Sequence, residues 1–279
     1  MNFPDSLAVA DTLEKATKND SGWILHHIMD GRILDFEPFG EVHIPQFPLL
    51  FGLDITPTKH VIFMWLSAIL VLITFALVAS KYRKSLIPKG FVNFFEVLIV
   101  FVKDEIAKPT IGKGFEKFLP YLLTVFFFIL FGNFLGLLPF SATFTANIAV
   151  TASLAIFTFF VTQAGGIMQN GFLGYFKGLV PHGIPTALLP LMIVVEFLGL
   201  LTKPFALAIR LFANMMAGHT VILALLGLIF FMGTYFIAPV SIGFALFIYL
   251  LEILVALIQA YIFTMLSGLF IGMAVHQEH

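Results

Sequence analysis

The chain of 279 residues contains no cysteine, so disulfide bonds, thiol nucleophiles and cysteine-ligated metal ions are excluded. Charged residues are also scarce: they make up 11% of the chain, where a soluble domain averages about 25%. The formal net charge of −1 offers no basic surface for nucleic acid. These shortages exclude a disulfide scaffold and a nucleic-acid-binding protein.

Apolar residues take the place of the missing charge. Hydrophobic residues make up 59% of the chain, including 35 phenylalanines, and the mean hydropathy is +1.01. A single soluble core cannot bury so many large aromatic side chains, whereas lipid can surround them. We therefore interpret the chain as an integral membrane protein.

Five apolar runs are long enough to cross a bilayer, which takes roughly 20 helical residues. The fourth run is too long to stand upright, since about 38 residues at ~1.5 Å each exceed the ~30 Å hydrocarbon core. It must tilt, protrude or kink, and Pro204 offers a place for a kink. The sequence predicts an all-α membrane protein whose last two spans form a long tilted hairpin. The five runs are 61–79, 118–140, 146–169, 187–225 and 241–275.

The charged residues are unevenly distributed along the chain. Residues 1–60 hold nine Asp or Glu and no spanning run, so we expect an N-terminal segment followed by a membrane domain at 61–279. Eight of the fifteen Lys and Arg lie between 81 and 117, which the positive-inside rule assigns to the cytoplasm. The N-terminal segment is then expected outside the cytoplasm, and five spans bring the C-terminus to the cytoplasmic side.

The basic stretch also has helical periodicity. We predict an amphipathic helix on the cytoplasmic membrane surface, in preference to a sixth span, because charged residues occupy its other faces. The apolar residues that repeat at helical spacing are Phe91, Phe94, Phe95, Leu98, Val102 and Ile106.

Ionisable residues are almost absent from the apolar runs. Between Lys117 and Glu278 the chain has five Lys, Arg, Asp or Glu, and one of them, Lys177, falls in a predicted loop. A charge at membrane depth costs at least a few kcal/mol and usually marks an ion pathway or a proton relay. The ionisable and strongly polar residues in the spans are Glu196, Lys203, Arg210, Asn214, His219, Glu252 and Gln259.

Several of these residues also have a purely structural interpretation. Glu196 and Lys203 could lie near the cytoplasmic end of their span and extend their head groups to water. Asn214 and Gln259 could hydrogen-bond between helices, and His219 could be a satisfied interior histidine.

Arg210 resists a structural interpretation, because it lies about 22 residues into its run, too deep for its head group to reach water easily. At ~100° per residue, Glu196, Lys203 and Arg210 share one stripe of the helix. His219 follows Arg210 by nine residues, so it lies about 180° round the helix and ~13 Å further along its axis. Spacing alone predicts two polar pathways on opposite sides of one helix, with the arginine between them.

Two motifs resemble the signatures of subunit a of F-type ATP synthases. Residues 203–219, Lys-Pro-Phe-Ala-Leu-Ala-Ile-Arg-Leu-Phe-Ala-Asn-Met-Met-Ala-Gly-His, resemble its pattern of a Pro, then Arg-Leu-Phe-x-Asn-x-x-Ala-Gly and a polar residue. Residues 257–263, Leu-Ile-Gln-Ala-Tyr-Ile-Phe, are similar to its second signature, on the last helix. Gly132 and Asn133, with the polar Glu-His tail, also fit, and the resemblance covers the membrane domain.

The chain departs from many bacterial members of that family at one pair of positions. They carry Glu directly after Ala-Gly and His seven residues before the glutamine, whereas this chain has His219 and Glu252. Glu252 and Gln259 share a face of the last helix, being seven residues apart. The exchange keeps one carboxylate and one imidazole, which could face each other across two packed helices. It leaves open which of the two is protonated first.

The resemblance implies a function and a set of residue roles. The family's partner is a ring of c subunits, each with a carboxylate at mid-membrane. Arg210 would hold that carboxylate ionised and separate two half-channels through which protons pass. The other residues of the implied proton path are His219 and Glu252 in the outer half-channel, Asn214 and Gln259 near the arginine, and Glu196 in the cytoplasmic exit.

The resemblance also implies partners and a location. The chain would be a non-catalytic component of a rotary ATP synthase, in contact with the c ring, the subunit b peripheral stalk, the rest of the complex and the lipid bilayer. We expect it in a bacterial plasma membrane, and a histidine relay favours protons over sodium ions because imidazole titrates near neutral pH. We expect no cofactor and no bound metal.

Three other classes of membrane protein fit the sequence less well. A secondary transporter usually has inverted repeats and broken helices, and the sequence shows neither. A haem protein would need histidine ligands within spans, where only His219 lies. An intramembrane protease would need a Ser–His, paired-Asp or His-Glu-x-x-His arrangement, and the acids available within spans are Glu196 and Glu252.

Overall fold

The structure, a computed structural model, describes residues 31, 33–35, 41–44, 56–82, 90–138, 141, 143–178, 189–232 and 236–276. Over these residues the regular structure is helical apart from one antiparallel hairpin. Its strands β1 (Ile33–Asp35) and β2 (Glu41–His43) pair Ile33 with His43. Strands of three residues are too short to leave a periodic pattern, so the sequence did not indicate the hairpin. The all-α prediction is confirmed for the described residues from 56 onwards.

Five helices are long and apolar enough to cross a membrane, as the sequence predicts. The predicted runs coincide with them, and the largest difference is at the end of the fourth, which continues to Met232. The five helices are α3 (Lys59–Tyr82), α6 (Leu119–Gly136), α7 (Ile148–Asn170), α9 (Leu189–Met232) and α10 (Ala238–Val275).

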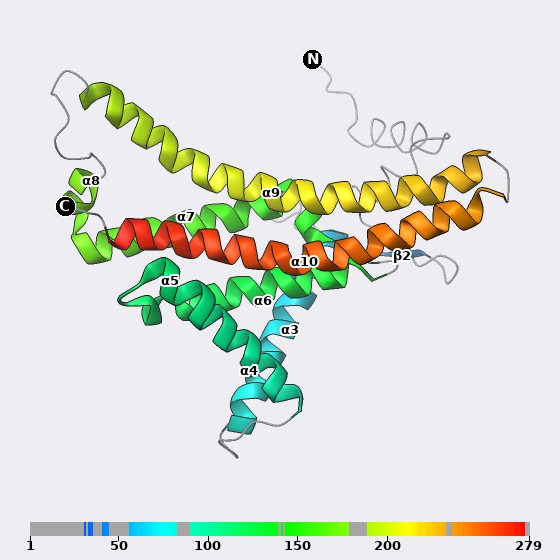
Figure 1. Ribbon diagram of the computed structural model, residues 1–279, viewed down its shortest axis with the longest axis horizontal. Helices are drawn as coiled ribbons and strands as arrows, with labels where there is room; N and C mark the ends of the chain where they lie inside the picture. The colour runs from blue at the N-terminus through cyan, green and yellow to red at the C-terminus, as the bar shows by residue number, and fades with distance from the viewer. Residues whose placement is uncertain are drawn as a thin grey trace.

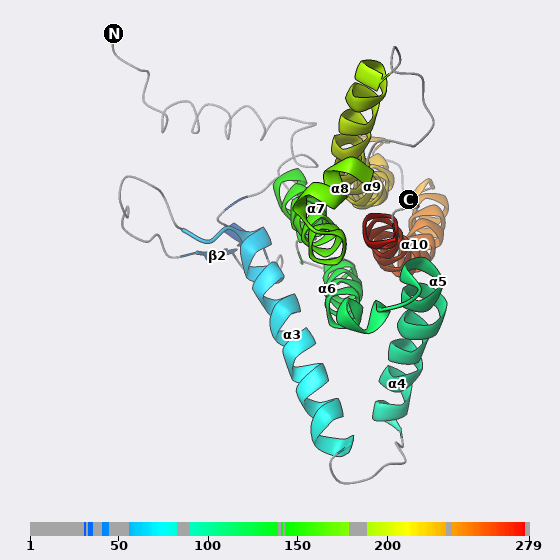
Figure 2. The same ribbon diagram turned by 90° about the vertical axis from the view of Figure 1, so that its left-hand side faces the viewer.

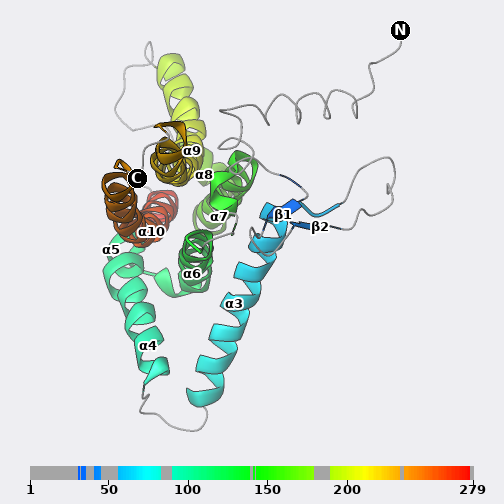
Figure 3. The ribbon, with the colours of Figure 1, turned by 90° about the vertical axis from the view of Figure 1, so that its right-hand side faces the viewer.

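Four of these helices form a bundle. In Figure 1, α6, α7, α9 and α10 extend along the long axis of the molecule. Figure 2 and Figure 3 show the same helices nearly end-on, with α10 packed against α6, α7 and α9, and with α3 leaving the bundle at a steep angle beside α4 (Phe91–Phe101). α9 and α10 lie against each other as antiparallel neighbours, so the predicted long hairpin is confirmed.

α9 is one continuous helix of 44 residues with Pro204 inside it. At ~1.5 Å per residue its length is roughly 66 Å, about twice the hydrocarbon core, so it must lie strongly tilted. Proline has no N–H to bond to the carbonyl of Leu200 and its ring crowds that carbonyl. Figure 1 shows a bend in the N-terminal half of α9, the half that contains Pro204.

The basic stretch forms one helical rod that is not among the five candidate spans. α4 continues through a π-helical segment, η1 (Val102–Ala107), into α5 (Lys108–Ile111). The predicted amphipathic helix is therefore present, but Phe91 and Phe94 do not join its buried face and are each 59% exposed. α4 begins at the end of the rod farthest from the bundle of α6, α7, α9 and α10, where few side chains can cover it (Figure 2). The buried face consists of Val92, Phe95, Val102, Ile106, Ala107 and Ile111.

The charged side of the rod suits a membrane surface. Lys108 Nζ lies 2.6 Å from Asp104 Oδ1, one turn away. The hydrogen bond from Lys108 lowers the pKa of the Asp104 carboxyl below its ordinary value. Glu105 is exposed beside this pair and Lys103 is half-buried. Charges on one side and apolar side chains on the other are typical of a helix at the lipid–water boundary, and this pattern holds for residues 102–108, whereas the exposed side of α4 is apolar and includes Val97 and Val100.

The apolar core lies where α6 meets α10 and the rod. α6 supplies large side chains such as Phe126 and Phe127, both nearly inaccessible. α10 supplies small residues instead, and a Cβ added at Gly272 would lie 2.0 Å from the carbonyl oxygen of Thr110. Only glycine at this position lets the backbones of α5 and α10 touch. The crossing sets where the C-terminal half of α10 lies.

Short elements complete the description: η2 (Phe115–Lys117), η3 (Phe144–Ala146) and α8 (Phe172–Gly178). Asn170 Nδ2, at the end of α7, donates to the carbonyls of Ala274 at 3.1 Å and Val275 at 3.3 Å. These carbonyls lack partners within α10 because the helix ends there. On α8, the Tyr175 hydroxyl donates to Gln163 Oε1 at 2.6 Å, and burial raises the pKa of that hydroxyl.

Candidate functional site

α9 and α10 carry all the polar residues that the sequence analysis assigned to the proton path. Asn214 Nδ2 on α9 donates to Gln259 Oε1 on α10 at 2.8 Å. Because the helices run antiparallel, higher residue numbers on α9 lie beside lower residue numbers on α10. Moving from Asn214 to His219 on α9 therefore goes the same way along the contact as moving from Gln259 to Glu252 on α10. A second pair therefore faces across the same contact.

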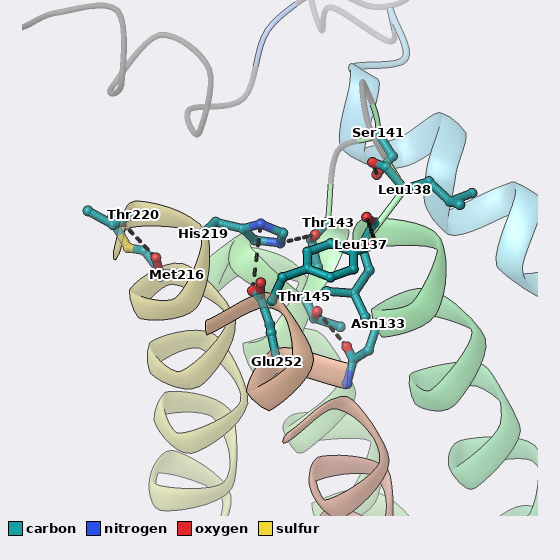
Figure 4. Close-up of polar contacts among 11 residues, drawn as sticks. Asn133, Leu137, Leu138, Ser141, Thr143, Thr145, Met216, His219, Thr220 and Glu252 are labelled. Carbon is teal, nitrogen blue, oxygen red and sulfur yellow. Dashed lines mark hydrogen bonds and ion pairs between the residues drawn. The ribbon is translucent and has the colours of Figure 1, made fainter. Parts of the chain in front are cut away.

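His219 and Glu252 form that second pair. Figure 4 shows the imidazole facing the carboxylate, and His219 Nδ1 lies 3.6 Å from Glu252 Oε1. Glu252 is 4% exposed, and neither of its oxygens has a hydrogen-bond partner in the described part of the chain. Gly218 leaves room for the carboxylate, since a Cβ there would lie 2.5 Å from Oε1. The carboxylate and the imidazole are thus enclosed together between α9 and α10.

The other side of the imidazole meets a hydroxyl group. Thr143 Oγ1 lies 2.5 Å from His219 Nε2, the ring nitrogen that does not face Glu252 (Figure 4). Thr143 precedes η3 in the connection between α6 and α7 and is 4% exposed. His219 thus links a hydroxyl and a carboxylate through its two different nitrogens.

Three hydrogen bonds anchor this connection to the α6–α10 contact. Thr145 Oγ1 donates to Asn133 Oδ1 at 2.8 Å, and Asn133 Nδ2 donates to the carbonyl of Ala256 at 3.3 Å. Tyr249 on α10 donates to the carbonyl of Leu137 at 2.8 Å, just after α6. The loop that presents Thr143 is therefore tied to the helix that carries Glu252.

Arg210 lies on another face of α9. It is exposed, whereas His219 is half-buried against α10 and the η3 connection. Three small, exposed residues share the face of Arg210 at helical spacing, four residues before it and three and seven residues after it: Ala206, Ala213 and Ala217. The arginine is therefore presented on an open strip of small side chains.

Glu196 and Lys203 are not brought together with the other residues. Glu196 is half-buried and lies four turns before Arg210, roughly 21 Å along the helix axis. Lys203 Nζ lies 5.7 Å from the centroid of the Phe270 ring on α10, a cation–π contact. This contact supports the structural interpretation of Lys203.

The arrangement suits proton transfer better than metal binding. In the described residues no group of three His, Asp or Glu could hold a metal ion. An imidazole between a hydroxyl and a carboxyl group can accept a proton at one nitrogen and release it at the other. Such a set of groups is chemically able to move a proton.

Sequence reasoning missed Thr143, Thr145 and Tyr249, because threonine and tyrosine in an apolar chain carry no signal of their own. Asn133 could have been found as a strongly polar residue inside an apolar run, where an amide needs partners. It was noted only as part of a resemblance, without a contact.

Comparisons with known proteins agree on one family. A family model described as "ATP synthase A chain" matches residues 61–272, which include all the site residues described above. The chain is 56% identical over 259 residues to the ATP synthase subunit a of Chloroherpeton thalassium, covering 91% of this chain and 77% of the relative. It is 52% identical over 264 residues to that of Pelodictyon phaeoclathratiforme, with coverages of 92% and 77%. It is 50% identical over 292 residues to that of an Anaeromyxobacter species, with coverages of 92% and 71%.

Proposed function

Because the chain belongs to the family of the ATP synthase A chain, we propose that it is the stator subunit that carries protons past the rotor ring of the enzyme. It is a non-catalytic, multi-pass membrane subunit of a bacterial ATP synthase. The observation that supports the proton path most directly is the placement of an exposed Arg210 and a buried His219–Glu252 pair on different faces of α9.

The open strip around Arg210 suits a partner made of packed helices. Its small residues, Ala206, Ala213 and Ala217, allow another helix to approach closely. A guanidinium group stays protonated in proteins, so the strip presents a permanent positive charge at its centre. A ring of c subunits with carboxylates at mid-membrane is the partner that this surface fits.

The positive charge of Arg210 determines which protonation state of a ring carboxyl is favoured at the stator face. A protonated, neutral carboxylic acid on the ring can face lipid, whereas an ionised one cannot do so cheaply. Arg210 favours the ionised form at the stator face, so each ring carboxyl releases its proton before it passes the arginine. The same fixed charge repels protons and keeps the two half-channels from joining.

Two groups of residues form the half-channels on either side of Arg210. On the outer side, His219 and Glu252 take up protons and pass them to the ring, and the Asn214–Gln259 hydrogen bond lines the path beside the arginine. On the cytoplasmic side, Glu196 accepts the released proton. These roles need groups that exchange protons reversibly, which imidazole and carboxyl groups do and guanidinium does not.

The proton path implies an orientation and a set of partners. The N-terminal segment lies outside the cytoplasm and the C-terminus inside, in the plasma membrane. Subunit b of the peripheral stalk holds this chain still while the ring turns. Each proton that crosses releases ~2.3 kcal/mol per 100 mV, which the rotor passes to a remote catalytic head. Most of the N-terminal segment lies outside the described residues.

The test is acidification of inverted membrane vesicles after addition of ATP. Arg210→Ala should abolish acidification while the complex still assembles, because the ring carboxylates lose the charge that keeps them ionised. Assembly is checked by co-purification of the rotor ring. Lys203→Ala is the matched control, since it removes a cation from the same helix where it contacts Phe270, and it should retain most of the pumping.

Normal acidification by an assembled Arg210→Ala complex would refute the separating role of the arginine. Failure of the wild-type chain to bring down a rotor ring would refute the stator function itself.

A further inference from the structure

The two nitrogens of His219 have different partners. Nδ1 faces Glu252 Oε1 at 3.6 Å, and Nε2 lies 2.5 Å from the hydroxyl oxygen of Thr143. A proton that enters an imidazole at one nitrogen can leave from the other. The Thr143 side of the ring therefore matters to a histidine relay as much as the Glu252 side.

Thr143 is held in place for this contact. Its hydroxyl lies over Gly136, where an added Cβ would lie 1.9 Å from Oγ1. The next residue, Phe144, is fully buried over Gly132, where an added Cβ would lie 2.3 Å from the ring. Two glycines one turn apart on α6 thus leave room for two consecutive side chains, and Thr143 cannot easily turn away from His219.

The neighbouring hydroxyl groups have other partners. Ser141 Oγ donates to the carbonyl of Leu138 at 2.7 Å, and Thr145 Oγ1 donates to Asn133 Oδ1 at 2.8 Å (Figure 4). Of the hydroxyl groups described between α6 and α7, that of Thr143 is the one in contact with the imidazole. The contact therefore depends on one side chain that can be changed without touching the others.

We propose that Thr143 delivers the proton to His219 at the outer end of the relay, an inference that rests on the proposed function of the chain as a proton channel. The hydroxyl takes a proton from the outer aqueous side and gives its own to Nε2, and Nδ1 gives its proton to the Glu252 carboxylate when the 3.6 Å between Nδ1 and Oε1 shortens to a hydrogen bond. The hydroxyl and the imidazole keep their proton counts, and Glu252 gains one. Loss of the Nε2 proton to water and uptake of one at Nδ1 restore the starting tautomer, with no net change in the proton count of the imidazole. His219 is therefore protonated before Glu252, because Glu252 lies beyond the imidazole.

The experiment compares loss of the hydroxyl with its retention at one position in the complete ATP synthase. Thr143→Val keeps the branched shape and removes the hydroxyl, while Thr143→Ser keeps the hydroxyl and removes the methyl group. ATP-driven acidification and gradient-driven ATP synthesis are measured in vesicles, with assembly checked by co-purification. Thr143→Val is expected to lower both rates about tenfold or more, and Thr143→Ser to keep them within about twofold of the wild type.

Ser141→Ala is the matched control, because it removes a hydroxyl of the same connection that bonds to Leu138 and lies off the relay. It is expected to leave both rates unchanged. If Thr143→Val does not assemble, Thr143→Ala removes the same hydroxyl with less bulk, and it is expected to be about tenfold slower than Thr143→Ser.

Two outcomes overturn the proposal: a hydroxyl-free variant that conducts like the wild type, or a Thr143→Ser complex as slow as the hydroxyl-free one. Unimpaired pumping by Arg210→Ala would instead refute the proposed function, so the two failures are distinguishable.

Discussion

At the scale of single residues, Glu252 and Arg210 differ in exposure and in whether the side chain can become neutral. Glu252 is buried at 4% exposure, and a carboxyl group can become neutral by binding a proton. Arg210 is exposed, and a guanidinium group cannot become neutral in a protein. Burying it without a counter-charge would cost several kcal/mol. The permanent cation therefore faces outward, where a carboxylate of the proposed rotor ring can reach it, and the protonatable acid faces inward.

The His219–Glu252 pair should work in either order. His219→Glu alone puts two carboxyl groups against each other, and Glu252→His alone puts two imidazoles there. Like groups at this distance repel when both are charged. The double exchange restores one imidazole and one carboxyl, so it should pump more protons than either single exchange in the vesicle acidification assay.

Gly218 stays unchanged in all three variants, because it leaves room for the carboxylate on α10. A double exchange that pumps no better than the better of the two single exchanges would argue that the two residues do not act as a unit.

At the scale of elements, the crossing of α5 over α10 depends on glycine. A Cβ at Gly272 would lie 2.0 Å from the Thr110 carbonyl oxygen, and one at Gly268 would lie 2.5 Å from the Thr110 hydroxyl. Nearby, Pro109 lacks an N–H and follows the π-helical segment, whose wider turn replaces regular α-helical bonding. The rod is thus shaped so that its backbone contacts α10 directly.

Gly272→Ala should destabilise the chain by about 1–3 kcal/mol, because the backbones of α5 and α10 must move apart. Gly243→Ala is the matched control on the same helix, where an added Cβ meets nothing within 4 Å. It should leave stability unchanged or raise it slightly, since alanine favours a helix over glycine by about 1 kcal/mol. The measurement is the temperature at which the chain aggregates from the purified complex, and equal temperatures for the two variants would contradict the crossing argument.

At the scale of the whole molecule, the helical bundle and α3 have different directions. α6, α7, α9 and α10 share one bundle, and α3 leaves it steeply (Figure 3). α9 is too long to stand upright in a bilayer, so the bundle must be strongly tilted in the membrane while α3 can cross more directly. A tilted bundle of this length offers a long helical face within the membrane to the proposed rotor ring.

The orientation can be tested by labelling, because the chain has no cysteine of its own. Asp20→Cys should react with a membrane-impermeant thiol reagent added from outside the cytoplasm, and Lys113→Cys should react only from the cytoplasmic side. The basic stretch that includes Lys113 stays on the cytoplasmic side by the positive-inside rule. Labelling of position 20 from the cytoplasmic side alone would contradict the proposed orientation.

The sequence by itself determined the class of protein, its five long helices and its resemblance to one family. These are local properties: apolar runs of sufficient length and two short motifs can be identified without knowing what packs against what. The same reasoning selected Arg210, His219 and Glu252, because a polar group at membrane depth stands out in any apolar run. It could not foresee that Phe91 and Phe94 lie outside the buried face, since burial depends on neighbouring helices.

Only the tertiary structure decided which polar groups meet. Asn214 bonds to Gln259 across 45 positions of sequence, and Thr143 bonds to His219 across 76. Such contacts follow from how helix faces pack and from glycines that allow close approach, and neither leaves a local pattern. A threonine in an apolar chain becomes part of the candidate relay only when the fold brings its hydroxyl to an imidazole.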